Sequence, residues 1–132
     1  LVDIGLSPDQ LTVIEKSPEL AQGLKTRFPN QNIVVGDAVA LDQIIGDQVA
    51  QVTAIVSSLP FMTIPRHVGD KIIDQMKACL HPDGVIIQFT YDPRPSKSIL
   101  LPHFRRLDSK VVLLNVPPAR VDVFGLCNEY QR

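Results

Sequence analysis

Residues 11–15 read Leu-Thr-Val-Ile-Glu, and residues 33–37 read Ile-Val-Val-Gly-Asp. Each segment is a short apolar run, which is typical of a buried strand, and each ends in an acid. Ligands of open α/β sheets bind outside the carboxyl ends of the strands. One acid there can accept hydrogen bonds from ribose hydroxyls, and a second can meet an adenine amino group. Glu15 and Asp37 therefore predict an edge of the sheet that binds a nucleoside.

The residues around these segments predict alternating strands and helices. Ser17 is a natural helix N-cap with Pro18 at the first helical position, and Pro29 ends the helix. A short helix through residues 41–45 then leads to a third strand at Val52–Val56, which runs into Ser-Ser-Leu-Pro at 57–60. Three consecutive strand ends therefore supply loops to one rim of the predicted sheet.

The second half of the chain predicts one long helix, one more parallel strand and a hairpin. Pro65 opens the helix, and His-Pro-Asp-Gly at 81–84 ends it before a strand at Val85–Thr90. A broken or short helix is expected at residues 96–107. Runs at 111–116 and 121–126 then flank Pro117-Pro118-Ala119-Arg120 as a closing hairpin. The predicted fold is α/β, a Rossmann-like, doubly wound and mostly parallel sheet with a C-terminal antiparallel hairpin, in a single domain over residues 1–132.

Composition narrows the class of protein further. The 132 residues carry a net charge of −1, which gives no global field to attract nucleic acid. Cys79 and Cys127 have no metal-ligand spacing, so two free thiols and no metal site are expected. No apolar run approaches the roughly 20 residues that a membrane helix needs, and no signal peptide opens the chain. A cytoplasmic setting is predicted.

Four motifs, spaced by about twenty residues, resemble those of a known family. They are Ile14–Glu19, Gly36–Ala38, Ser57–Pro60 and the His-Pro-Asp-Gly segment that follows Leu80. In order and spacing they look like the successive motifs of class I S-adenosylmethionine-dependent methyltransferases. The resemblance covers nearly the whole chain and implies S-adenosylmethionine as the cofactor.

Three segments resemble one branch of that superfamily more specifically. They are Ser-Ser-Leu-Pro with Phe61, the strand end Gln88–Tyr91, and Asn-Val-Pro-Pro-Ala-Arg-Val at 115–121. Together they look most like bacterial phospholipid N-methyltransferases, which methylate phosphatidylethanolamine and are related to the ribosomal RNA adenine dimethylases. The acidic motifs are common to the superfamily, whereas these segments are more specific.

The resemblance implies a role for each matching residue. Glu15 would bind the ribose hydroxyls, and Asp37 would face the adenine amino group beside the backbone N–H of Ala38. Cofactor binding is thus assigned to Glu15, Lys16, Asp37, Ala38 and Ser57, and the catalytic loop to Ser57, Ser58, Leu59 and Pro60. The protein must chiefly align an amine with the methyl group and exclude water. The proton of the ammonium substrate has three candidate acceptors, Asp92, Tyr91 and bulk solvent.

The chain departs from the family at its start, because no Gly-x-Gly is present in the 132 residues. The family's glycine-rich loop, which follows the first and central strand, is expected upstream of Leu1, so the chain is interpreted as an N-terminally truncated domain. In the superfamily strand order 3-2-1-4-5-7-6, loss of strand 1 leaves a two-stranded and a four-stranded part. The exposed strand edges then favour a homodimer.

The predicted substrate rests on a local group of basic residues, since the overall charge is balanced. Five of them follow the strand end at Thr90, namely Arg94, Lys97, Arg105, Arg106 and Lys110. They predict binding of a phospholipid headgroup and peripheral contact with the inner membrane, although a solvated helix face is the simpler interpretation. Two alternatives stay open: an enzyme like the ribosomal RNA adenine dimethylases, and a non-catalytic fold remnant that oligomerises. Acids after strands are also often only helix N-caps.

Overall fold

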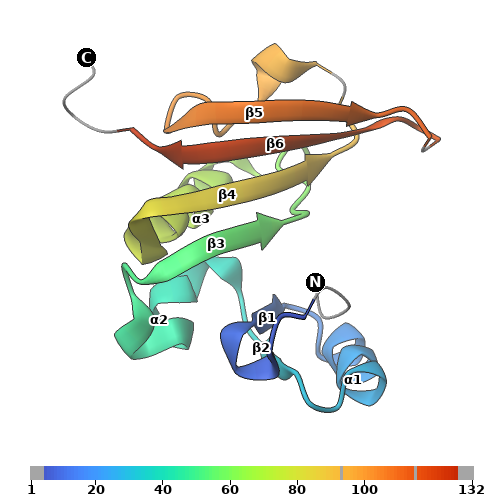
Figure 1. The fold of residues 1–132 in the computed structure, drawn as a ribbon, viewed down its shortest axis with the longest axis vertical. Coiled ribbons are helices and arrows are strands. Elements are labelled where there is room, and N and C mark those ends of the chain that lie inside the picture. Colours follow the sequence, from blue (N-terminus) through green and yellow to red (C-terminus); the bar gives the residue numbers. More distant parts are fainter. Residues whose placement is uncertain (1–4, 93, 115, 128–132) are drawn as a thin grey trace.

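The computed structural model describes residues 5–92, 94–114 and 116–127. Strands and helices alternate through the first two thirds of the chain, and a pair of strands closes it (Figure 1). The strands are β1 (Thr12–Glu15), β2 (Asn32–Val35), β3 (Val52–Ser57), β4 (Leu80–Thr90), β5 (Phe104–Val112) and β6 (Ala119–Leu126), and the helices are α1 (Pro18–Arg27), α2 (Leu41–Ile45) and α3 (Arg66–Cys79).

The strands form two sheets. β1 and β2 pair in parallel, while the larger sheet has the order β3-β4-β6-β5. β3 and β4 are parallel, and β6 is antiparallel to both β4 and β5. In Figure 1 the small sheet and α1 lie beyond β3, on the side away from β4. The predicted α/β fold with its C-terminal antiparallel hairpin is confirmed, and so is the division into two and four strands.

Local signals account for where the smaller helices begin and end. The Ser17 hydroxyl accepts a hydrogen bond from the Leu20 N–H at 3.3 Å, and Pro18 occupies the first turn of α1. Gly46 ends α2 with a φ of 55°, in the left-handed region that glycine tolerates best.

The core lies between α3 and the larger sheet. Apolar residues at helical spacing give α3 one buried stripe that includes Ile72, Ile73 and Met76. This stripe packs against Ile86 of β4 and Phe124 of β6, which are fully buried paired neighbours on adjacent strands. α3 therefore covers the same face of the sheet that carries the site described below.

The predicted start of β4 was wrong. The His-Pro-Asp-Gly stretch at 81–84 is part of β4, which begins at Leu80 rather than at Val85. The ladder with β3 is irregular there, since Val52 pairs with Leu80 and Ala54 with Val85. A strand can hold proline and glycine at such a bulge, because the ladder needs no hydrogen bond from those residues.

The helix predicted at residues 96–107 was also wrong. Only Pro95–Lys97 forms a short 3₁₀ turn, and β5 begins at Phe104. β5 pairs with β6 along its whole length and ends at Val112, before the end predicted for the first hairpin strand. Long-range pairing here overrides a helical pattern that Pro102 already weakened.

The described residues also bear on the expectations from composition. Cys79 is buried and Cys127 is exposed, and both are free. Among residues 5–92, 94–114 and 116–127, no helix is long and apolar enough to cross a membrane, and no group of three His, Cys, Asp or Glu side chains is placed to hold a metal ion.

Candidate functional site

Glu15 and Asp37 lie at the carboxyl ends of the neighbouring strands β1 and β2. Glu15 pairs with Val35, and its carbonyl accepts a hydrogen bond from the Gly36 N–H at 3.0 Å. Asp37 therefore lies two residues past the last rung of the ladder. Gly36 packs closely against Ile44, since a Cβ there would lie 2.6 Å from its Cδ1, so a larger residue would require that side chain to move. The structure thus brings the two predicted nucleoside-binding acids to one edge.

The Glu15 carboxylate organises the start of α1. Its Oε1 accepts a hydrogen bond from the Ser17 N–H at 2.8 Å, and the side chain is partly buried. One such bond leaves a carboxylate with further lone pairs, which are free to accept hydroxyl donors. Glu15 can therefore stabilise the start of α1 and bind a ligand at the same time.

Asp37 is held on both carboxylate oxygens. Its Oδ1 accepts from the Val39 N–H at 3.2 Å and caps the turn that begins at Ala38, while its Oδ2 lies 2.9 Å from Nζ of Lys16. The Lys16 hydrogen bond, with help from Val39, lowers the pKa of this carboxyl. The Lys16 side chain is 78% exposed, so the ion pair is weak and a ligand amino group can replace it.

The Ser57–Pro60 loop is an ordered turn at the end of β3. The buried Ser57 hydroxyl accepts from the Leu59 N–H at 3.3 Å. The Leu59 carbonyl in turn accepts from Nε2 of Gln88 at 3.1 Å. Ser58 and Pro60 are exposed on the outer side of the turn. A buried amide on β4 thus sets the position of the predicted catalytic loop.

The two groups of predicted residues belong to different sheets. Glu15, Lys16, Asp37 and Ala38 come together at the ends of β1 and β2, and residues 57–60 lie at the end of β3. Ala38 and Leu59 both pack against the core cluster under α3. Both groups therefore adjoin the same core.

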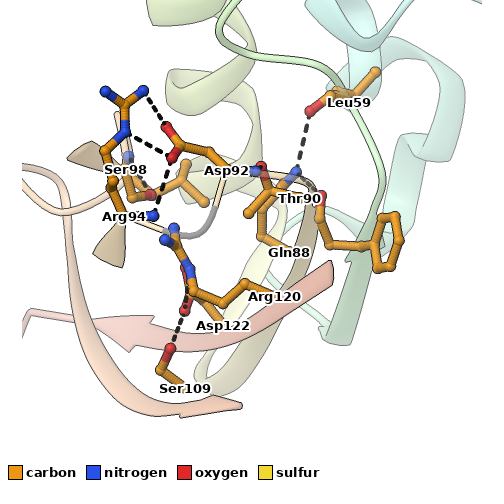
Figure 2. Close-up of polar contacts among 11 residues, drawn as sticks. Leu59, Gln88, Thr90, Asp92, Arg94, Ser98, Ser109, Arg120 and Asp122 are labelled. Carbon is orange, nitrogen blue, oxygen red and sulfur yellow. Dashed lines mark hydrogen bonds and ion pairs between the residues drawn. The ribbon is translucent and has the colours of Figure 1, made fainter. Parts of the chain in front are cut away.

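Beside the predicted loop lies a row of polar side chains that the sequence prediction missed. Ser57 pairs with Gln88, Gln88 with Asp122, and Asp122 with Ser109, so one rung of the larger sheet is polar from edge to edge. Paired residues in a sheet share a face, which places the four on one side. Figure 2 shows Gln88 below the Leu59 carbonyl, with Asp122 and Ser109 further along the row.

Asp122, within this row, forms a buried ion pair with Arg120 of the same strand. Nε and Nη2 of Arg120 approach the Asp122 carboxylate at 2.9 Å, and the side chains are only 2% and 0% exposed. The Ser109 hydroxyl donates to the same carboxylate at 2.6 Å. Nη1 of Arg120 and Oε1 of Gln88 are buried with no hydrogen-bond partner. Nη1 can donate to an acceptor group of a ligand or water, and Oε1 can accept from a donor group.

Asp92, one of the three candidate proton acceptors, is fixed by Arg94 just past the end of β4. Arg94 Nε and Nη2 donate to its two oxygens at 2.9 and 3.1 Å (Figure 2). The hydrogen bonds from the Arg94 side chain, and to a smaller extent the one from its backbone N–H, lower the pKa of Asp92 from 3.8 to about 2. A carboxylate held in this way is a weak base near neutral pH.

We expect Asp92→Asn to flatten the acid limb of the stability curve. Because the pKa of Asp92 falls from 3.8 to about 2, its contribution is complete above pH 3.8 and is lost as the pH falls toward 2. Melting temperatures measured from pH 5 to pH 2 should therefore fall less steeply in the variant. Asp83→Asn, which changes an exposed acid on β4, is the control, and equal slopes for wild type and Asp92→Asn would contradict the expectation.

The five basic residues grouped by sequence do not form one cluster at this rim. Arg94 binds Asp92, and Lys110 pairs with Val121 near the end of β4. Arg105 and Arg106 pair with Gly125 and Phe124, toward the amino end of β4. Grouping them with a site at the carboxyl ends was wrong, because six residues of strand between Arg106 and Val112 span about 20 Å.

Solved structures match this chain, whereas no protein-family model and no curated protein does. The N-methyltransferase NodS from Bradyrhizobium japonicum WM9, in complex with S-adenosyl-L-homocysteine, aligns with 91% of this chain and 68% of its own, with TM-score 0.71 and 13% identity. An rRNA methylase from Streptococcus thermophilus aligns with 86% of this chain and 72% of its own, with TM-score 0.61 and 14% identity.

A third structure is the Burkholderia thailandensis 1,6-didemethyltoxoflavin-N1-methyltransferase with bound 1,6-didemethyltoxoflavin and S-adenosylhomocysteine. It aligns with 90% of this chain and 62% of its own, with TM-score 0.67 and 16% identity. At identities this low, the similarity shows the fold alone. The chain has the fold of class I S-adenosylmethionine-dependent methyltransferases, as its motifs predicted, while specificity for phospholipid stays a prediction.

Proposed function

We propose that this chain is the catalytic domain, or part of it, of an S-adenosylmethionine-dependent methyltransferase whose acceptor is the amine of phosphatidylethanolamine. The observation that carries the proposal is the pair of acids, Glu15 and Asp37, at the carboxyl ends of adjacent parallel strands in this fold. The carboxyl edge is where such sheets bind ligands.

The residues present fit the nucleoside end of the cofactor. Glu15 has lone pairs left for the ribose hydroxyls, and Asp37 can exchange its exposed Lys16 partner for the adenine amino group. The Ala38 N–H begins a turn beside them. When bound, the cofactor supplies an activated methyl group on a sulfonium. The 132 residues contain no Gly-x-Gly for its methionine end.

The acceptor end of the proposed site is the Ser57–Pro60 loop with Gln88. The Leu59 carbonyl, held by Gln88, and the unpartnered Gln88 Oε1 are both acceptors for the N–H groups of an amine. These two acceptors would orient an amine so that its lone pair faces the methyl group that a bound cofactor would supply. Tyr91 and solvent remain as acceptors for the proton that the ammonium loses, since Asp92 is bound by Arg94.

The lipid substrate is supported by the specific segments that resemble phospholipid N-methyltransferases. Arg120, in the Pro-Pro-Ala-Arg segment, lies two residues from Asp122 in the polar row and keeps one unpartnered N–H₂ group. Arginine is well suited to phosphate oxygens. A net charge of −1 and the absence of tryptophan give little support to RNA binding.

The nucleoside site is tested by titrating S-adenosylhomocysteine into the chain and following backbone amide signals by NMR. We expect shifts at Lys16, Gly36 and Ala38, and a loss of affinity of about tenfold to hundredfold in Asp37→Asn, since a charged hydrogen-bond acceptor is removed. Asparagine keeps an oxygen for the Val39 N–H, so the turn survives. Glu19→Gln, an exposed acid in the first turn of α1, is the matched control.

Equal affinity of Asp37→Asn and wild type would remove Asp37 from the site, and unshifted amides at all three residues would overturn the proposal. The substrate is tested separately with labelled S-adenosylmethionine and vesicles that contain phosphatidylethanolamine. Methyl transfer to adenine in RNA, with none to the lipid, would reject the lipid acceptor and retain the methyltransferase.

A further inference from the structure

The connection between β5 and β6 exposes a group of aliphatic side chains. Leu113, Leu114 and Val116 are 76%, 96% and 99% exposed, and Val111 of β5 is 50% exposed. Soluble proteins seldom present neighbouring aliphatic residues so fully to water unless the patch has a function. We call residues 111–114 and 116–118 the hairpin tip.

The hairpin tip projects from the rim that carries the candidate site. β6 is antiparallel to β4, and Arg120 at its start pairs with Thr90 at the end of β4. Val112 and Ala119 form the last described rung of the β5–β6 ladder, so the tip extends beyond that rung. In Figure 1 it lies at the same end of the molecule as the arrowheads of β3 and β4. Whatever contacts the tip therefore lies at the end of the sheet that carries the loop at residues 57–60.

Polar contacts hold the base of the hairpin, and its flank is basic. The Ser109 hydroxyl of β5 donates to the Asp122 carboxylate of β6, which also pairs with Arg120 of the same strand, just below the tip. Lys110 is exposed beside it, and residues 110–121 include no acid. A protruding aliphatic tip with a lysine at its base suits an anionic lipid surface, where the side chains enter the acyl region and the ammonium meets the headgroups.

We propose that the hairpin tip docks this protein onto an anionic lipid bilayer, with Leu113, Leu114 and Val116 inserted among the lipids. The inference deepens the proposed function, on which it rests for its meaning, because docking through this rim presents a lipid amine to the loop at residues 57–60. A protein partner would need a groove matched to a narrow, convex tip, whereas a fluid bilayer requires no such complementarity.

The absence of tryptophan from the sequence makes a direct test possible. In Leu114→Trp the single indole should shift its emission to the blue on mixing with vesicles of phosphatidylcholine and phosphatidylglycerol, and brominated acyl chains should quench it. The matched control is Leu20→Trp, since Leu20 is 61% exposed on α1, outside the hairpin, and its emission should not change.

Cosedimentation with the same vesicles gives the size of the effect. The double variant Leu113→Ser with Leu114→Ser should bind at least about tenfold more weakly, because apolar burial is lost. Lys110→Glu should weaken binding about tenfold on anionic vesicles and leave binding to pure phosphatidylcholine unchanged. Leu20→Ser should bind like wild type.

Unshifted Leu114→Trp emission with vesicles would overturn the inference. A blue shift that grows with protein concentration in the absence of vesicles would overturn it too, in favour of self-association between copies. Neither experiment contains a cofactor, so each outcome is independent of the S-adenosylhomocysteine titration, and failure of one proposal is distinguishable from failure of the other.

Discussion

Asp122→Ala is expected to destabilise the fold by about 3–5 kcal/mol, because it leaves the Arg120 charge buried without its counter-ion. The Asp122 carboxylate is fully buried and receives hydrogen bonds from Arg120 and Ser109. A domain of ordinary stability has about 5–15 kcal/mol in total, so the variant lies close to its unfolding threshold. Urea unfolding followed by circular dichroism measures the change in the free energy of unfolding.

Two controls separate burial of the charge from loss of an acid as such. Asp108→Ala removes an exposed carboxylate on β5 that accepts a local hydrogen bond from the Ser109 N–H, and should cost within about 1 kcal/mol. Arg120→Leu combined with Asp122→Val removes both charges and should recover most of the lost stability. If Asp122→Ala were no more destabilising than Asp108→Ala, the buried pair would not contribute to the stability of the fold.

The sequence was sufficient for the parts of the fold that local patterns define. Strands β1 and β2 and the helix between them follow from apolar runs, a serine cap and a proline break, all within thirty residues of one another along the chain. The acids that end these strands could be predicted for the same reason. A parallel pair places consecutive carboxyl ends at one edge whatever the rest of the fold does.

The errors lie where pairing between distant residues decides the structure. Phe104 belongs to a strand because it pairs with Leu126, and the bulge at residues 81–84 exists because β3 and β4 meet in two registers. Local propensity carries no information about either partner. The basic residues were misplaced for the same reason. A helix was expected there, whereas the observed strand β5 places Arg105 and Arg106 at the end far from the candidate site.

The polar row was missed although one signal for it is present in the sequence. Arg120 and Asp122 alternate with Val121 and Val123 in a run that ends in buried Phe124, so the polar residues share the face of a core residue. Charges at core-facing positions of a strand indicate a buried ion pair. Its neighbours Gln88 and Ser109 required the register between strands, which only the structure supplies.

Phe124→Ala is expected to cost about 3–5 kcal/mol, since it leaves a cavity in the centre of the core. Phe124 is fully buried between α3 and the larger sheet, in the cluster with Ile73, Met76 and Ile86. For a chain of this size the loss lowers the melting temperature by roughly 10–20 °C. Differential scanning calorimetry at neutral pH measures that shift.

Phe28→Ala provides the matched control, because the chemical change is the same at a site of different burial. Phe28 is 38% exposed at the end of α1 and has the Arg27 guanidinium 5.3 Å from its ring centroid. Its loss should cost about 1–2 kcal/mol, mostly from the area it still buries. Phe28 packs in the part of the chain that holds β1 and β2, whereas Phe124 lies on β6, the strand that also carries Arg120. Equal shifts from the two variants would place the core of the protein outside the contact between α3 and the larger sheet.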